Sequence, residues 1–357
     1  MTELTPRPTP HAASAVPPLP RHDPIANLPI VVLYPHSRCN CRCQMCDIWQ
    51  VTTKQEISSA EAAAWLPWFR ELGVQRVILS GGEPLMHSDL WSLCAALHSE
   101  GIGVTILSTG LLLRRHAAEV ARYCDDVIVS LDGPPKVHDR IRRIPRAYDK
   151  LEEGVRAVKL ADPGVSVSGR CTVQRGNFRY LRATVAAARS LGLDRISFLA
   201  ADVSTDAFNR PGGWAPDRKR EVALEAPDLP LLEQELGALE RECDADFAAG
   251  YIAEPPEKLR RRLYQYFAAL LGTGDFFPND CNAPWVSTVI ESDGTVRPCF
   301  FQPALGNIRQ AGSLDAVLNS PAAQAWRRGL DTRRDAICRK CVCSISLRTR
   351  SDNVSAV

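Results

Sequence analysis

Residues 37–47 read SRCNCRCQMCD and follow directly on the apolar run 30–34. Cys39, Cys43 and Cys46 in this stretch have the spacing C-x3-C-x2-C. Three thiolates can hold three irons of a [4Fe–4S] cube, and the fourth iron then has no protein ligand. An iron open to an outside ligand suits catalysis, whereas a fully ligated cube suits electron storage. The stretch therefore predicts a cluster-binding loop directly after a buried strand.

Outward from this loop, apolar β-branched runs alternate with amphipathic stretches. The runs are short and apolar on both faces, which is typical of parallel strands covered by helices. Alternation of this kind predicts βα units with right-handed crossovers. We expect an α/β fold, a partial (β/α)6 TIM-like barrel, with its chemistry at the carboxyl ends of the strands. The predicted strands are 29–34, 75–80, 103–108, 126–131, 165–173 and 194–199, and the predicted helices are 58–72, 88–100, 111–123, 147–161 and 178–191.

Composition excludes several classes of protein. The chain has 357 residues and a formal net charge of +2, so nothing in it favours nucleic acid or an anionic membrane as a partner. No apolar run approaches the length of a membrane span. Thirteen cysteines without an export signal favour metal binding in a reducing cytoplasm over a disulfide scaffold. We therefore expect a cytoplasmic protein with room for one large and one smaller domain.

Distinctive residues follow the later strands as well. The second strand ends in SGGEP over 80–84, where two glycines let the backbone approach a ligand and Glu83 can accept from an ammonium group. Ser108-Thr109-Gly110 follows the third strand and Ser130-Leu131-Asp132-Gly133 the fourth. Residues 138–143 read HDRIRR, and one of these arginines can bind a carboxylate, although runs of arginine more often form basic surface loops.

Together these elements resemble the radical S-adenosylmethionine (radical SAM) superfamily over residues 29–200. The matching features are the three-cysteine loop, Gly-Gly-Glu-Pro, and Ser-Leu-Asp-Gly with a downstream His-Asp. The resemblance implies a [4Fe–4S] cluster whose open iron chelates S-adenosylmethionine. Reductive cleavage of the sulfonium then yields a 5′-deoxyadenosyl radical that takes a hydrogen atom from a substrate. The resemblance also implies an electron donor of the flavodoxin or ferredoxin type.

The resemblance assigns roles residue by residue. Met45 stands before the third cysteine, where the family often has an aromatic residue, so an apolar contact to adenine survives but stacking does not. Arg142 is implied to contact the carboxylate or the ribose of the cofactor, and Arg140 and Arg143 are alternatives for this contact. The implied metal ligands are Cys39, Cys43 and Cys46, and the implied cofactor contacts are Gly82, Glu83, Ser108, Ser130, Arg142, Arg170 and Leu199.

A second group of cysteines lies near the C-terminus. A β-hairpin is predicted around Ser292-Asp293-Gly294, because Asp-Gly readily adopts positive φ, and a helix near 313–329. Residues 276–350 resemble the SPASM/Twitch extensions of radical SAM enzymes. The resemblance implies one auxiliary [4Fe–4S] cluster, in the shorter Twitch form because no cysteine follows Cys343. Structural zinc on four thiolates is the alternative. The implied ligands are Cys281, Cys299, Cys338 and Cys341, with Cys343 able to replace Cys341 or to have no role.

The remaining segments carry weaker signals. We expect a disordered Pro-rich tail over 1–28, the barrel over 29–202, a helical linker or lid over 203–275, and a tail over 351–357. Alternation along a strand places Cys171 on the helix side if Arg170 faces the barrel interior. This favours a core position for Cys171, with a role as hydrogen donor as the alternative.

The sequence narrows the reaction without fixing it. Four available thiolates predict a fully ligated auxiliary cluster that transfers electrons. Phe300 follows Cys299 where related dehydrogenases place an acid, so no catalytic base is assigned and simple alcohol or thiol oxidation is disfavoured. Residues 1–28 are too short for a peptide-recognition domain, which favours oxidation, epimerisation or rearrangement of a small biosynthetic substrate. A peptide maturase and a non-catalytic iron–sulfur or zinc scaffold are the alternatives.

Overall fold

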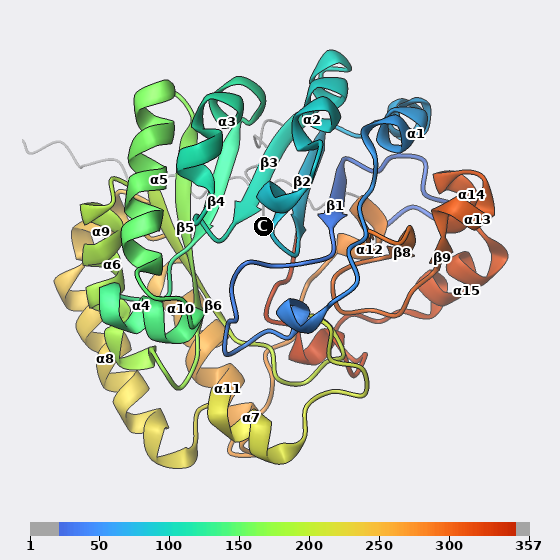
Figure 1. Cartoon of the computed structure of the whole chain (residues 1–357). Coiled ribbons are helices and arrows are strands. Elements are labelled where there is room, and N and C mark those ends of the chain that lie inside the picture. The colour runs from blue at the N-terminus through green and yellow to red at the C-terminus, as the bar shows by residue number, and fades with distance from the viewer. Residues whose placement is uncertain (1–20, 348–357) are drawn as a thin grey trace, which may run out of the picture.

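The computed structural model describes residues 21–347, and a curved nine-stranded sheet forms its centre (Figure 1). The strand order is β6-β5-β4-β3-β2-β1-β7-β8-β9, and every pair from β6 to β7 is parallel. The six strands of the predicted barrel are therefore present in sequence order. The strands are β1 (Ile30–His36), β2 (Arg76–Gly81), β3 (Gly103–Ser108), β4 (Asp126–Ser130), β5 (Ser166–Val173), β6 (Arg195–Ala200), β7 (Ser287–Ile290), β8 (Thr295–Arg297) and β9 (Gly306–Asn307).

Helices follow the strands and cover the outer side of the sheet, where α1, α2, α3 and α5 lie side by side (Figure 1). Local chemistry sets their ends: Ser58 caps α1, because its hydroxyl accepts from the backbone N–H of Glu61 at 3.1 Å. The predicted α/β partial barrel is confirmed. The barrel helices are α1 (Ser59–Glu71), α2 (Leu90–Ser99), α3 (Ala117–Tyr123), α4 (Pro135–Arg142), α5 (Ala147–Ala161) and α6 (Leu181–Ser190).

Helix α4 corrects one interpretation of the sequence. The alternative offered for the arginine-rich run 138–143, a basic surface loop, is wrong, because most of the run belongs to this helix. Val137, His138, Ile141 and Arg142 form its buried face, and the chain leaves the helix at Arg143 with a left-handed φ of 53°. The helix therefore carries Arg142 into the interior rather than onto the surface.

The C-terminal extension joins the barrel sheet. The predicted hairpin is present as β7 and β8, and Gly294 in its turn has a φ of 85°. Strand β7 also pairs in parallel with β1, from Ile30 with Ser287 to Leu33 with Ile290. This pairing places the second cysteine group beside the loop that follows β1. The extension also contains α12 (Ala283–Val286), α13 (Ile308–Ala311), α14 (Leu314–Leu318) and α15 (Pro321–Gly329).

Residues 203–275 pack onto the barrel. On α8, Glu235 accepts from the backbone N–H of Arg182 on α6 at 3.0 Å and forms an ion pair with its guanidinium at 2.9 Å. Ile252 forms a parallel bridge with Ile196 of β6. The segment contains α7 (Pro216–Val222), α8 (Leu229–Glu242), α9 (Asp244–Ala248), α10 (Pro256–Leu259), a π-helix (Arg260–Gln265) and α11 (Tyr266–Leu270).

The expected tails need one correction. Residues 21–28 were assigned to the disordered segment, but Leu28 is fully buried and Asp23 pairs with Arg327 of α15 at 2.6 Å. Burying these groups offsets the entropy cost of ordering the segment. Residues 1–20 and 351–357 lie outside the described part of the chain.

Candidate functional site

A cavity of about 250 Å³ opens at the carboxyl ends of the barrel strands. Nearly every predicted cofactor contact lies in its wall, together with all three cysteines of the first group. Met45, Phe208, Phe300, Phe301 and Cys343 also line it. The lining residues predicted from the sequence are Cys39, Cys43, Cys46, Met45, Gly82, Ser108, Ser130, Arg142, Arg170 and Leu199.

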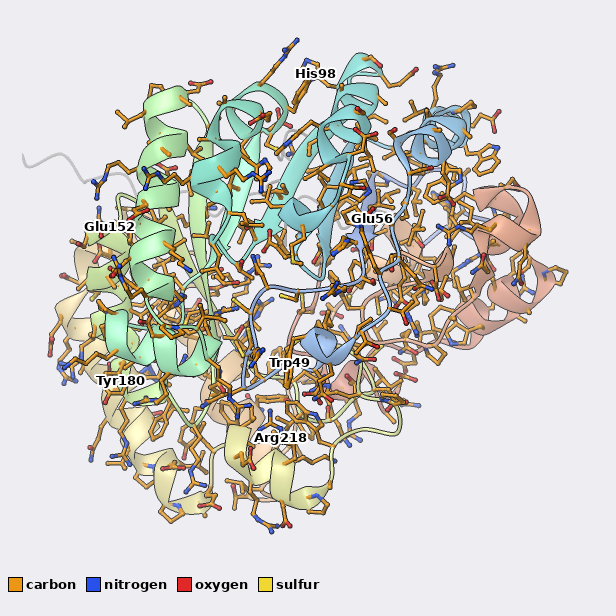
Figure 2. All side chains as sticks on the ribbon, in the orientation of Figure 1. Trp49, Glu56, His98, Glu152, Tyr180 and Arg218 are labelled. Atoms are coloured by element: carbon orange, nitrogen blue, oxygen red, sulfur yellow. The ribbon has the colours of Figure 1, made fainter. Side chains whose placement is uncertain are left out.

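The cysteine loop after β1 is held from several directions. Its backbone N–H groups at Arg42 and Gln44 donate to the carbonyls of Arg142 and Ile141, at 3.1 and 3.0 Å. Arg218 of α7 donates to the Gln44 carbonyl. Figure 2 shows Arg218 on the same side of the molecule as Trp49, whose indole donates to the Cys46 carbonyl at 2.9 Å. These contacts fix the loop over the cavity.

The three thiols fit a metal cluster by their chemistry. The backbone N–H of Ile48 donates to the Cys46 sulfur at 3.5 Å, as expected beside a cluster thiolate. Burial raises the pKa of Cys46 to about 12, and burial with the nearby Cys43 raises the pKa of Cys39. A hydrogen bond with the Cys41 thiol and the charge of Arg142 lower the pKa of Cys43 against the effect of burial. Metal binding would release these protons, because only thiolates ligate.

Of the three arginines in 138–143, Arg142 is the one that lines the cavity. Its guanidinium donates to the Cys43 sulfur at 3.3 Å and forms an ion pair with Asp132 at 2.7 Å, with both side chains buried. Arg140 instead donates to the Gly176 carbonyl, and Arg143 is exposed. Arg142 therefore contacts a predicted cluster ligand directly. Its predicted contact with the methionine carboxylate stays a prediction.

Glu83 has a different environment from the one expected. It is fully buried outside the cavity wall, and burial raises its pKa. Its carboxylate accepts from the Ser108 hydroxyl at 2.9 Å, from the Thr109 backbone N–H at 2.7 Å and from that of Leu85 at 3.1 Å. Glu83 thus ties the end of β2 to the end of β3. Its contact with an ammonium group also stays a prediction.

The Gly-Gly turn after β2 depends on its glycines. A Cβ at Gly81 would overlap the ring of Tyr34, and one at Gly82 would overlap the carbonyl oxygen of Arg38. The backbone N–H of Glu83 donates to that same carbonyl at 2.9 Å. The turn therefore packs directly against the cysteine loop, and only glycine lets the two backbones approach so closely.

Strand β5 obeys the expected alternation. Arg170 and Thr172 line the cavity, whereas Cys171 is fully buried on the helix side and accepts from the Asn177 side chain at 3.5 Å. Leu199 of β6 also lines the cavity, and its contact with an adenine stays a prediction. The prediction that Cys171 faces the helices is confirmed.

The second cysteine group lines a smaller cavity of about 30 Å³ behind the first. Five thiols meet there, from the hairpin, from the segment before α12 and from the C-terminal turn. Within residues 21–347, no three His, Cys, Asp or Glu side chains are close enough together to hold a single metal ion, at this group or at the first. The five residues are Cys281, Cys299, Cys338, Cys341 and Cys343.

Comparisons with known proteins identify both parts of the chain. Residues 33–179 match the family model of the radical SAM superfamily, and residues 281–342 match that of the SPASM iron–sulfur cluster-binding domain. The first implies S-adenosylmethionine and a [4Fe–4S] cluster, and the second implies auxiliary iron–sulfur binding. Between residues 21 and 347, no helix is long and apolar enough to cross a bilayer.

The proteins to which this chain is similar are named for different activities. The Fe-coproporphyrin III synthase of Methanosarcina barkeri is 29% identical over 48% of this chain and 43% of its own, so the chain spans less than half the length of that relative. The PqqA peptide cyclase of Rhizobium meliloti is 27% identical over 85% of this chain and 76% of its own. The fold is similar to that of native anSMEcpe with bound AdoMet, with a TM-score of 0.64 at 17% identity and 88% coverage of both chains.

Proposed function

We propose, on the premise that this chain is a radical SAM enzyme with a C-terminal SPASM domain, that it abstracts a hydrogen atom from a small biosynthetic substrate. The observation that carries the proposal is the cavity in which three thiols, the Gly-Gly turn and the ends of β3 to β6 converge. When bound, S-adenosylmethionine and its [4Fe–4S] cluster would supply a 5′-deoxyadenosyl radical there.

The residues of the chain would bind and orient the reactants. Cys39, Cys43 and Cys46 would ligate three irons and leave the fourth open. Arg170 is a cavity-lining cation whose guanidinium donates only a long hydrogen bond, 3.4 Å to Ser197, and it forms no ion pair with another side chain of residues 21–347. It therefore has capacity to hold a carboxylate of the cofactor or substrate.

Apolar side chains would close the site against water. Phe208, Phe300 and Phe301 line the cavity and pack against one another, with ring centroids 5.9 Å apart for Phe208 and Phe301 and 6.3 Å for Phe300 and Phe301. Excluding water protects a reactive radical from side reactions. Met45 and Leu199 supply the apolar surface expected for an adenine.

The second thiol group would bind an auxiliary [4Fe–4S] cluster that transfers electrons. Cys281, Cys299, Cys338 and Cys341 supply the four ligands that full ligation needs. A flavodoxin or ferredoxin-type protein is the class of donor with a suitable potential. A reducing cytoplasm would keep the thirteen cysteines out of disulfides, as they are in the structure.

Peptide modification is the second candidate. The match to a PqqA peptide cyclase covers 85% of this chain, whereas the match to the Fe-coproporphyrin III synthase covers 48%. A relative that aligns through the SPASM region as well as the barrel supports a peptide substrate for the same hydrogen abstraction.

Release of 5′-deoxyadenosine from anaerobically reconstituted, reduced protein tests the proposal. We expect release in the wild type, none in Cys43→Ala, and about eight irons per chain if two cubes are bound. No release from the wild type under several reductants would support a non-catalytic scaffold instead. About four irons with one zinc would support the zinc alternative at the second group.

A further inference from the structure

Three residues, Phe300, Phe301 and Cys343, line both cavities and thus separate the two thiol groups. Two of them are apolar rings, so Cys343 is the member of this partition with a reactive side chain. The SPASM match covers residues 281–342 and ends one residue before this thiol. Cys343 therefore needs an explanation of its own.

Hydrogen bonds at sulfur distinguish Cys343 from Cys341, the ligand that it could replace. The backbone N–H of Cys343 donates to the Cys341 sulfur at 3.3 Å, and the Gln302 side chain donates to the Cys338 sulfur at 3.3 Å, as is common for cluster thiolates. Among residues 21–347, no donor is found at the sulfur of Cys343.

The surroundings of Cys343 connect it to the larger cavity. The side chain is partly exposed, and it lines the same cavity as Arg170. Arg170 and Leu199, both predicted cofactor contacts, line the same cavity. By contrast, Cys171 is fully buried on the other side of β5. Cys343 is thus a cavity-facing thiol outside both predicted ligand sets.

We propose that Cys343 is a catalytic hydrogen-atom donor that returns hydrogen to the substrate radical. The inference rests on the proposed function. The S–H bond of Cys343 breaks, its hydrogen forms the new C–H bond of the product, and its sulfur becomes a thiyl radical. One electron, from the same low-potential donor that drives sulfonium cleavage, and one proton from solvent then restore the thiol.

The proposal narrows the product class. The adenosyl group takes one hydrogen from the substrate and Cys343 returns another, so the substrate is neither oxidised nor reduced. The product is then an epimer or another isomer of the substrate, whether a small molecule or a peptide residue. A thiol suits this step, because an S–H bond is weaker than most C–H bonds and yields its hydrogen readily to a carbon radical.

The test needs no identified substrate. In buffered D2O the thiol becomes S–D, and without substrate the adenosyl radical takes deuterium from the nearest thiol. We expect wild-type protein to form monodeuterated 5′-deoxyadenosine, and Cys343→Ser to lower the deuterated fraction at least several-fold. The matched control is Cys171→Ala, which removes a thiol that faces away from the cavity and should leave the deuterated fraction unchanged.

Two readouts that do not depend on turnover separate a donor from a ligand. Cys343→Ser should keep the wild-type iron content, whereas Cys341→Ser should lower it. Iodoacetamide should alkylate Cys343 in the reconstituted protein and spare the four ligands, as read by peptide mass spectrometry. Loss of iron in Cys343→Ser, or an unchanged deuterated fraction, overturns the donor role. Absence of 5′-deoxyadenosine from the wild type overturns the proposed function itself.

Discussion

Among single residues, Arg142 has the most direct connection to the predicted cluster. Its N–H donates to the Cys43 sulfur at 3.3 Å, and its charge is partly balanced by Asp132. A cationic donor at a ligand sulfur favours the reduced cluster, which carries more negative charge. Arg142→Gln should therefore lower the reduction potential of the N-terminal cluster, and Asp132→Asn should raise it, in redox titrations followed by electron paramagnetic resonance.

The same pair should matter for activity. Groups that hydrogen-bond metal ligands typically contribute about 10- to 100-fold in affinity or activity, and we expect a loss in that range for Arg142→Gln. The matched control is Arg140→Gln on the same helix, because Arg140 donates to the Gly176 carbonyl outside the cavity. Equal potentials in the two variants would show that the contact with Cys43 has no electrostatic effect.

A second prediction for a single residue concerns Gly82. A Cβ at this position would overlap the carbonyl oxygen of Arg38, so the cysteine loop would have to move. We expect Gly82→Ala to destabilise the fold by about 1–3 kcal/mol in urea unfolding and to lower iron loading. Gly329→Ala is the control, because nothing lies within 4 Å of its added Cβ. Equal iron contents would mean that the loop tolerates the displacement.

Residue types and spacing were enough to predict most of the cavity wall, because each predicted residue follows a strand whose direction is fixed. Residue types and spacing did not predict the hydrogen-bond partners of Glu83 or the position of Cys343. The partners of Glu83 lie 25 and 26 residues away on another strand end. The position of Cys343 depends on β7 pairing with β1. Such long-range contacts leave no local pattern.

At the scale of elements, strands were the most predictable. The sequence placed all six barrel strands within one residue at nearly every end, because buried parallel strands read as continuous apolar runs. Helix α4 was missed because its arginines suggested a surface loop. Its buried positions 137, 138, 141 and 142 have helical spacing, but two of them are polar residues whose burial depends on partners elsewhere.

Glu56 joins three segments near the cysteine loop and predicts an acid-sensitive contact. It accepts from Lys54 and Ser88 and pairs with His36 at the end of β1, at 3.0, 2.6 and 3.0 Å. Despite partial burial, the hydrogen bonds from Ser88 and Lys54 lower its pKa from 4.5 to about 2. A lowered carboxyl pKa stabilises the fold above 4.5, and that stability is lost as pH falls toward 2.

We therefore expect Glu56→Gln to lower unfolding free energy by about 1–3 kcal/mol at pH 6, with a smaller difference at pH 3. Urea unfolding at both values measures this. Glu152→Gln is the control, because Glu152 is an exposed acid of α5 far from Glu56 (Figure 2) and its ion pair with Arg156 is largely solvated. A constant difference between pH 6 and pH 3 would argue against the shifted pKa.

Over the whole molecule, the barrel and the C-terminal extension, which carry one cysteine group each, share one continuous sheet. Strand β7 pairs with β1, and Asp23 in the segment before β1 pairs with Arg327 of α15. Neither contact was predicted, since a hairpin signal is local and does not say which strand it joins. Because the C-terminal module shares its sheet with the barrel, loss of a cluster in one should weaken the other.

The variant Cys338→Ser/Cys341→Ser tests this coupling. Removing two ligands should lower iron from about eight to about four per chain and shift thermal unfolding of the whole protein downward in a single transition. The N-terminal cluster should still change its paramagnetic spectrum when S-adenosylmethionine is added, because Cys39, Cys43 and Cys46 are untouched. Two separate transitions, with the barrel melting at its wild-type temperature, would show instead that the β1–β7 pairing does not transmit stability between the modules.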